Sequence, residues 1–315
     1  MTEGNDYETR VKRRGYRPVP MQIRPGSFGE NLNEWFRMIG ETWRPLLILC
    51  AVVYVPLGIL TIALFLVPEV FGAYFDLVVP ETDIQSPAEM LELFGPLIWV
   101  GLIWTLLQLV ATVLVYVTAG RAVAIRAGGG NSTASELLRF ALSRLGAGVG
   151  AGLVLLVGFV VLASLVVLVG WALISAMGAD FFPVFMTAVV ALTALVVMIW
   201  LGVSISLYPQ ALAMEDVTAT ESLASSFLLV RGRWWPTLGF EMVTGLIVSA
   251  VAQVLSFVLV PIVFLGLVAP AFLAVGYGLA TMLQGPVAAG IGLAYAIWYV
   301  DLRARKVSLT SDELV

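Results

Sequence analysis

Long apolar runs, separated by short polar stretches, dominate the pattern of residues along this chain. A transmembrane helix needs about 20 consecutive, mostly apolar residues, and six runs reach that length. They cover residues 46–67, 97–120, 149–177, 184–208, 237–260 and 272–300. We therefore predict an all-α integral membrane protein with six transmembrane helices.

Three amphipathic segments precede the first, third and fifth of these runs, and each opens with a capping box. In a capping box, a hydroxyl side chain and a glutamate three residues later satisfy free N–H groups of the first helical turn. The three boxes are Ser27–Glu30, Thr133–Glu136 and Thr218–Glu221. Apolar residues follow each box at helical spacing, which indicates short helices lying in the membrane interface. We expect the first of them to end at Pro45.

The first and third segments share more than the box. A phenylalanine, a tryptophan and a proline follow the glutamate at the same offsets in both: Glu30, Phe36, Trp43 and Pro45 in one, and Glu221, Phe227, Trp234 and Pro236 in the other. Such self-similarity is typical of repeat architectures. We predict three parallel repeats, each an interfacial helix followed by a two-helix hairpin, over residues 27–120, 132–208 and 218–301.

The remaining segments complete the domain plan. Residues 1–26 are predicted to be a disordered basic arm, residues 27–306 the membrane domain and residues 307–315 a polar tail. Residues 68–95 carry acidic side chains without lysine or arginine, which indicates an outer loop. Residues 261–272 fit either an outer turn or a re-entrant segment.

Two further features concern helix packing. Four glycines near the start of the third run give two overlapping GxxxG spacings, which suit close approach of a neighbouring helix. They are Gly146, Gly148, Gly150 and Gly152. Pro286 is expected to kink the sixth helix.

Composition and charge agree with this plan. The chain is 60% hydrophobic and only 12% charged, which is typical of a membrane protein. All 17 lysines and arginines fall in segments that the plan places on one side. The positive-inside rule then places both termini in the cytoplasm. The isoelectric point near 5.0 argues against a nucleic-acid partner, and the polar N-terminal stretch does not resemble a cleavable signal peptide.

The chain contains no histidine and one cysteine, Cys50. The lack of histidine excludes Ser-His and Cys-His nucleophile pairs, His-ligated zinc and HExxH motifs. A single cysteine excludes an intramolecular disulfide. We expect no catalytic residue, no metal site and no cofactor.

Three short motifs, spread over nearly the whole chain, carry a resemblance to a known family. They are Arg-Pro-Gly-Ser-Phe-Gly-Glu at 24–30, Leu-Val-Arg-Gly-Arg-Trp-Trp at 229–235 and Tyr-Val-Asp-Leu-Arg at 299–303. The chain resembles the prokaryotic family named after the membrane domain of glycerophosphoryl diester phosphodiesterase. The resemblance implies a fold and a location in the prokaryotic cytoplasmic (inner) membrane. It implies no activity, because the phosphodiesterase chemistry resides in a separate soluble barrel with catalytic histidines.

The first candidate site is Glu241, about one turn into the fifth run. Charged residues inside a membrane often mark function. Near the start of a helix, however, a carboxylate also meets the positive end of the helix dipole. We expect Glu241 either to pair with Arg44, Arg231 or Arg233 or to form a ligand or proton site.

A second candidate combines arginines with tryptophans at the start of two spans. Arginine suits phosphate groups and tryptophan sits at headgroup level, so these residues predict a site for anionic lipid. The alternative is ordinary anchoring in the interface. The residues are Arg44, Arg231, Arg233, Trp43, Trp234 and Trp235.

The third candidate is a set of glutamines inside the predicted spans, Gln108, Gln253 and Gln284. They could line a polar path, or they could form hydrogen bonds between helices.

These observations favour a non-enzymatic multi-pass membrane protein that binds or organises anionic lipid, or a partner protein, at the inner leaflet. The alternative is a permease or exporter of a small solute or lipid that uses Glu241 and the glutamines. Membrane lipids are the expected partners, and a protein partner or a homo-oligomer stays open.

Overall fold

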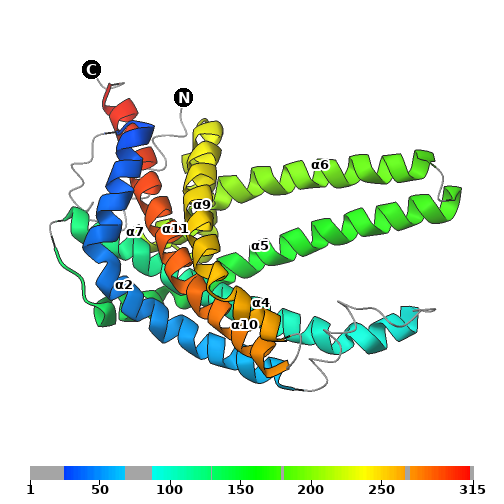
Figure 1. The fold of residues 1–315 in the computed structure, drawn as a ribbon. Helices are drawn as coiled ribbons and strands as arrows, with labels where there is room; N and C mark the ends of the chain where they lie inside the picture. The colour runs from blue at the N-terminus through cyan, green and yellow to red at the C-terminus, as the bar shows by residue number, and fades with distance from the viewer. Residues whose placement is uncertain (1–24, 68–86, 129, 179–180, 267–269, 313–315) are drawn as a thin grey trace.

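The computed structural model describes residues 25–67, 87–128, 130–178, 181–266 and 270–312, and in these ranges the ordered structure is helical, with no strand. The helices are α2 (Phe28–Phe65), α4 (Pro87–Ala127), α5 (Ala134–Met177), α6 (Phe181–Ile205), α7 (Tyr208–Met214), α8 (Ala219–Val230), α9 (Trp234–Phe257), α10 (Val260–Gly266) and α11 (Pro270–Asp312) (Figure 1). Six segments are long and apolar enough to cross a membrane, by length and composition. This confirms the predicted all-α class and the six predicted spans.

The predicted capping residues do begin helices. Ser27 and Thr218 each accept a hydrogen bond from the third residue of their helix, and the glutamate there accepts one in return from the backbone of the capping residue. Thr133 accepts from the Glu136 N–H at 3.4 Å. Local sequence therefore sets where α2, α5 and α8 start.

The predicted ends of the interfacial helices are wrong in two of three cases. α2 passes through Pro45 and continues to Phe65, and α5 is likewise one continuous helix. Only α8 is separate, because the chain turns at Gly232, whose φ of 86° lies in the left-handed region. When Glu30 is aligned with Glu221, the position of Gly232 is taken by Glu41. A residue with a Cβ pays a steric cost in that conformation, so α2 does not break there.

Other boundaries also differ from the sequence prediction. The acidic loop predicted for residues 68–95 ends earlier, because α4 begins at Pro87, and proline suits the first turn of a helix. The polar tail predicted from residue 307 is helical as far as Asp312. The predicted turn or re-entrant segment at 261–272 contains most of α10 and the start of α11. The basic arm, up to residue 24, lies outside the described residues.

The centre of the fold is the contact between α2 and α11. Gly58 and Gly278 face each other so closely that a Cβ on either would lie 2.7 Å from the carbonyl oxygen of the other. The Trp35 indole N–H donates to the Gly290 carbonyl oxygen at 2.8 Å, and Phe65 stacks on Tyr277 with ring centroids 4.9 Å apart. Two glycines of α11, Gly278 and Gly290, thus allow α2 to approach closely.

α7 connects this centre to the rest of the protein. All seven of its residues are buried, and the Gln210 amide donates to the Gly292 carbonyl oxygen at 3.1 Å and to the Tyr116 carbonyl oxygen at 3.4 Å. A Cβ on Gly120 would lie 2.2 Å from Gln210 Oε1, so the backbone of α4 at Gly120 packs directly against side chains of α7. The chain therefore crosses the core at α7, directly after the break that separates α7 from α6.

α5 and α6 form a hairpin that extends away from the other helices (Figure 1). At its base, a Cβ on Gly148 would lie 2.4 Å from Val113, and one on Gly152 would lie 2.5 Å from Leu109. The predicted close approach thus occurs at one of the two GxxxG spacings, between α5 and α4. Beyond this base the hairpin exposes its apolar side chains.

Candidate functional site

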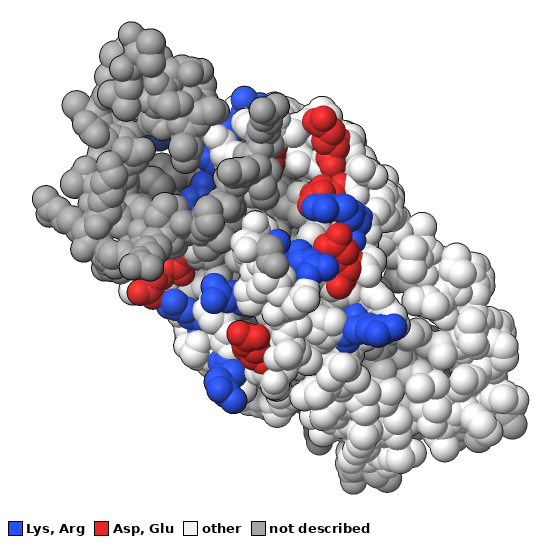
Figure 2. Space-filling model, turned by 90° about the vertical axis from the view of Figure 1, so that its left-hand side faces the viewer, with Lys and Arg blue, Asp and Glu red and all other residues white. Residues whose placement is uncertain are grey.

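Charged side chains gather on one face of the molecule (Figure 2). Ion pairs join helix ends and linkers that are distant in sequence: Arg126 of α4 to Glu41 of α2, Arg144 of α5 to Asp216 before α8, and Arg303 of α11 to Glu215 after α7. The charged ends of four helices and the link between α7 and α8 therefore lie on the same side of the fold.

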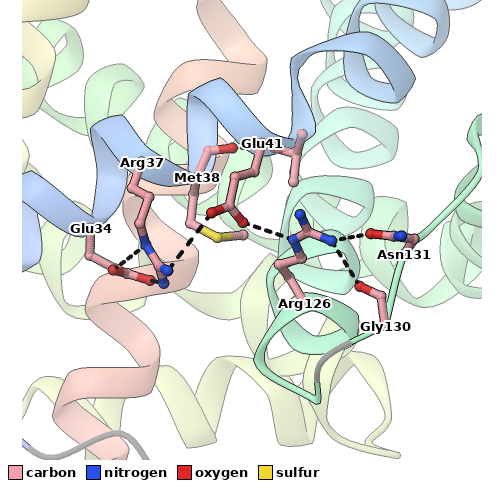
Figure 3. Close-up of polar contacts among 8 residues, drawn as sticks. Glu34, Arg37, Met38, Glu41, Arg126, Gly130 and Asn131 are labelled. Atoms are coloured by element: carbon pink, nitrogen blue, oxygen red, sulfur yellow. Dashed lines mark hydrogen bonds and ion pairs between the residues drawn. The ribbon is translucent and has the colours of Figure 1, made fainter.

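The best-connected group on this face lies between α2 and α4 (Figure 3). Glu34 forms an ion pair with Arg37, whose guanidinium lies 3.8 Å from Glu41. Glu41 also accepts from Arg126 Nε at 2.8 Å, and Arg126 Nη1 donates to the side chain of Asn131. These side chains are partly exposed, so the group links two helices while staying accessible to a ligand.

A second group is buried where α11 meets the link between α7 and α8. Glu215 accepts a hydrogen bond from the Tyr299 hydroxyl and lies 2.9 Å from the Arg303 guanidinium. Both Glu215 and Tyr299 are buried, so the pair contributes to packing rather than to a surface.

The first and third motifs of the resemblance also meet in space. The Gly26 N–H donates to Asp301 Oδ1 at 2.8 Å, and Arg305 binds both Asp301 and the Gly26 carbonyl oxygen. Asp301 and Arg303 have opposite charges and stand two residues apart, yet they do not pair with each other. In the structure the two residues have different partners, because neighbours on a helix point in different directions.

The predicted arginine and tryptophan site forms two separate groups. Arg44 lies over the Trp43 ring, 5.2 Å from its centroid, and both side chains are exposed. Arg231 and Arg233 are exposed at the turn before α9, next to Trp234 and Trp235. In the described part of the chain, no ion pair, hydrogen bond or ring contact joins the two groups.

These arginines differ from most others on the charged face. Among the described arginines, five form ion pairs, namely Arg37, Arg126, Arg144, Arg303 and Arg305, and five form none, namely Arg44, Arg121, Arg139, Arg231 and Arg233. Arg121 lies instead over the Phe140 ring. Trp235 is 76% exposed, and the Trp234 indole N–H donates to the Trp200 carbonyl oxygen at 3.2 Å. Three guanidinium groups beside tryptophans are therefore open to an external anion.

Glu241 does not pair with an arginine in the described part of the structure, contrary to one of the two expectations. Its carboxylate accepts a hydrogen bond from the Ser206 hydroxyl, at the end of α6. The start of α9 thus contacts the break between α6 and α7, and that break places a serine where arginine was expected. The other expectation, a ligand or proton site, stays a prediction.

The three glutamines are only partly brought together. Gln108 of α4 donates to Gln284 of α11 at 2.9 Å, whereas Gln253 is exposed on α9. Of the two alternatives, a hydrogen bond between helices therefore describes Gln108 and Gln284. Within the described ranges, no group of three or more His, Cys, Asp or Glu side chains is placed to hold a metal ion, and Cys50 is buried.

The architecture defines a class of protein, the multi-pass α-helical membrane proteins. Within it, residues 139–302, just over half of the chain, match the family described as a domain of unknown function, DUF7847, and the chain belongs to this family. A search of curated proteins and a search of solved structures each found no significant match. The resemblance to the phosphodiesterase membrane-domain family is not tested by these findings and stays a prediction.

Several contacts of the charged face could not be singled out from sequence. Tyr299 and Arg305 stand in ordinary helical contexts, and their partners come from segments far away in the chain. Glu215 carried a signal, since it is a carboxylate directly after a long apolar run. Arg303, its ion-pair partner on α11, carried no signal that pointed to Glu215.

Proposed function

We propose that this protein is a non-enzymatic membrane protein that binds anionic lipid at one membrane interface through Arg44, Arg231 and Arg233. The observation that supports the proposal is that these three exposed arginines stand beside tryptophans and, unlike their ion-paired neighbours, have no carboxylate partner among the described residues. Arg139 is also exposed without an ion pair, but it has no tryptophan near it in sequence. Each lies next to an interfacial tryptophan in sequence or space. Arginine binds phosphate through directed hydrogen bonds, and tryptophan prefers the headgroup level.

The orientation in the membrane belongs to the same proposal. The charged face would lie against the cytoplasmic leaflet of a prokaryotic inner membrane, with both termini in the cytoplasm, because lysine and arginine concentrate in segments on that side. The three predicted repeats would each begin at this leaflet. The side-chain caps at Ser27, Thr133 and Thr218 support this arrangement. Anionic lipid of this leaflet attracts basic residues at about 1 kcal/mol each.

The test compares lipid retention by native mass spectrometry, with the purified protein in mild detergent and a short-chain phosphatidylglycerol as the probe. The double variant Arg231→Gln and Arg233→Gln should weaken binding about 30-fold, which corresponds to about 2 kcal/mol for two contacts. The matched control is Arg144→Gln, which removes a charge that already pairs with Asp216. It should change binding less than about threefold. Equal losses in the double variant and the control would reject the proposal.

A permease or exporter is the second candidate, supported by the Ser206–Glu241 contact. A partly buried carboxylate inside a membrane helix that is bonded to a hydroxyl, and not to an arginine, is free to exchange a proton or a cation. Solute flux in proteoliposomes that disappears in Glu241→Gln would support this function. Flux that is indifferent to Glu241→Gln would exclude Glu241 as its site.

A further inference from the structure

A cavity of about 650 Å³ opens on the charged face, between the start of α2 and the ends of α4 and α11. Its size is within the range that is usual for small-ligand sites. Polar side chains of α2 and α4 surround an apolar floor that includes Met38, Val123 and Val300. This cavity is distinct from the positions of Arg44, Arg231 and Arg233, which do not line it.

The cavity contains a polar group that lacks a partner. Asn31 is 5% exposed, and its Nδ2 has no hydrogen-bond partner among the described residues. A buried amide without a partner is costly, and most buried polar groups in proteins are satisfied. An acceptor atom of a bound molecule would remove this cost. Asn31 therefore indicates that the cavity holds a ligand with an acceptor oxygen.

The charges around the cavity are balanced. Glu30 and Glu34 supply two carboxylates, and Arg37 and Arg126 supply two guanidinium groups; Figure 3 shows three of these four side chains. The hydrogen bonds of Arg126 use Nε and Nη1 and leave Nη2 as a donor, while Glu30 uses Oε2 to accept from the Ser27 N–H and leaves Oε1 as an acceptor. A ligand with one sign of charge would face two groups of the same sign. A zwitterion matches both.

The position of the cavity favours a ligand that comes from the membrane. The exposed tryptophan of α2, Trp43, follows Arg37 by six residues, which is at most about 9 Å along a helix. Tryptophan lies at the level of the lipid headgroups. Arg37 and the cavity are therefore within reach of a headgroup whose acyl chains stay in the bilayer.

We propose that this cavity binds the headgroup of a zwitterionic phospholipid, one that carries an ammonium and a phosphate group, as ethanolamine phospholipids do. Asn31 Nδ2 and Arg126 donate to the phosphate, and Glu30 accepts from the ammonium. The apolar floor contacts the methylene groups between them. The proposal is independent of the anionic-lipid site.

The experiment measures binding by native mass spectrometry with dioctanoyl phosphatidylethanolamine, dioctanoyl phosphatidylglycerol and free phosphoethanolamine as probes. Asn31→Asp removes the donor and keeps the size of the side chain, so it should weaken ethanolamine-lipid binding about tenfold or more. Gly40→Asp adds the same charge at an exposed position on the same helix that does not line the cavity and has nothing within 4 Å of its Cβ position, and it should change binding less than about threefold. Unchanged binding in Asn31→Asp would overturn the proposal.

A second variant keeps the test valid if Asn31→Asp fails to fold. Ala127 lines the cavity and is only partly buried, so Ala127→Phe blocks the cavity without disturbing the core, and it should abolish saturable binding. Tight binding of free phosphoethanolamine in the wild type would assign the same chemistry to a soluble zwitterion. Phosphatidylglycerol that binds as tightly as phosphatidylethanolamine, or Ala127→Phe that binds as the wild type does, would reject the zwitterion site.

Discussion

The contact between α2 and α11 and the hairpin of α5 and α6 are both built from helices apolar enough to cross a membrane, yet they pack very differently. In the most apolar stretch of α2, 39% of the residues are buried, whereas in α5 and α6 the share is 6%. Along α2 and α11, stacked rings, backbone approach and an indole hydrogen bond follow one another from Tyr277 to Gly290. In the hairpin, the close approach of Gly170 to Thr187 is an isolated feature of this kind.

The difference shows what holds helices together in lipid. Acyl chains are as apolar as leucine, so apolar side chains gain little by leaving lipid for another helix. Helix–helix contact is favoured over helix–lipid contact by small residues, which let a neighbouring helix approach closely, and by polar groups that form hydrogen bonds across the interface. α11 has these features where it faces α2, and most of the hairpin lacks them. The comparison predicts that substitutions will be costly in the first region and nearly neutral in the second.

The largest effect is expected from Gly58→Leu. A Cβ at Gly58 would lie 2.5 Å from Met282 Cγ and 2.7 Å from the Gly278 carbonyl oxygen, so the two backbones would have to separate. We expect a loss of about 3 kcal/mol in the free energy of unfolding, measured by denaturation in mixed micelles. Gly158→Leu in α5 is the control, since nothing lies within 4 Å of its Cβ position. Equal losses of stability in both variants would contradict the comparison, because they would show that Gly158 also lies in a tightly packed contact.

An intermediate effect is expected from Trp35→Phe. The substitution removes the hydrogen bond from the indole to the Gly290 carbonyl oxygen but keeps an aromatic ring. The loss should be about 1 kcal/mol in the same unfolding measurement. Trp171→Phe makes the same change in α5, where the side chain is 70% exposed, and should stay within about 0.5 kcal/mol of the wild type. A larger loss of stability in Trp171→Phe than in Trp35→Phe would contradict the comparison.

The smallest effect is expected from Gln108→Leu. It removes the hydrogen bond from α4 to Gln284 of α11, and such bonds contribute about 0.6 kcal/mol in membranes. Gln253→Leu serves as the counterpart, because Gln253 is exposed on α9 and its loss should cost nothing. If Gln253→Leu proved the more costly change in the unfolding midpoint, Gln253 would have to bond a second molecule.

Sequence could predict what depends on near neighbours. The six spans follow from apolar runs, and the starts of α2, α5 and α8 follow from Ser27, Thr133 and Thr218. The continuation of α2 through Pro45 was not predicted, because proline removes one hydrogen bond but a long apolar helix retains the others. The deciding residue was Gly232, whose left-handed conformation makes α8 a separate helix.

The candidate site was predictable only as a set of residue types. Arg44, Arg231 and Arg233 were singled out by their tryptophan neighbours, and the structure adds that they lack ion pairs in the described residues. Nothing local distinguishes Asn31 from Asn33, since one is buried and the other exposed only through the packing of α4 and α11. The Ser206 partner of Glu241 likewise depends on the break after α6, which the sequence did not indicate.

The bond between Gly26 and Asp301 constrains how the protein is made. The ribosome adds about 5–20 residues per second, so α2 is in the membrane roughly 10 to 50 seconds before residue 301 is synthesised. During that interval the glycine face that receives α2 does not yet exist. α5 and α6, whose contacts are close in sequence, can assemble at once. During synthesis α2 therefore stays in the lipid without α11, and an insertion chaperone or a competing helix has time to bind it.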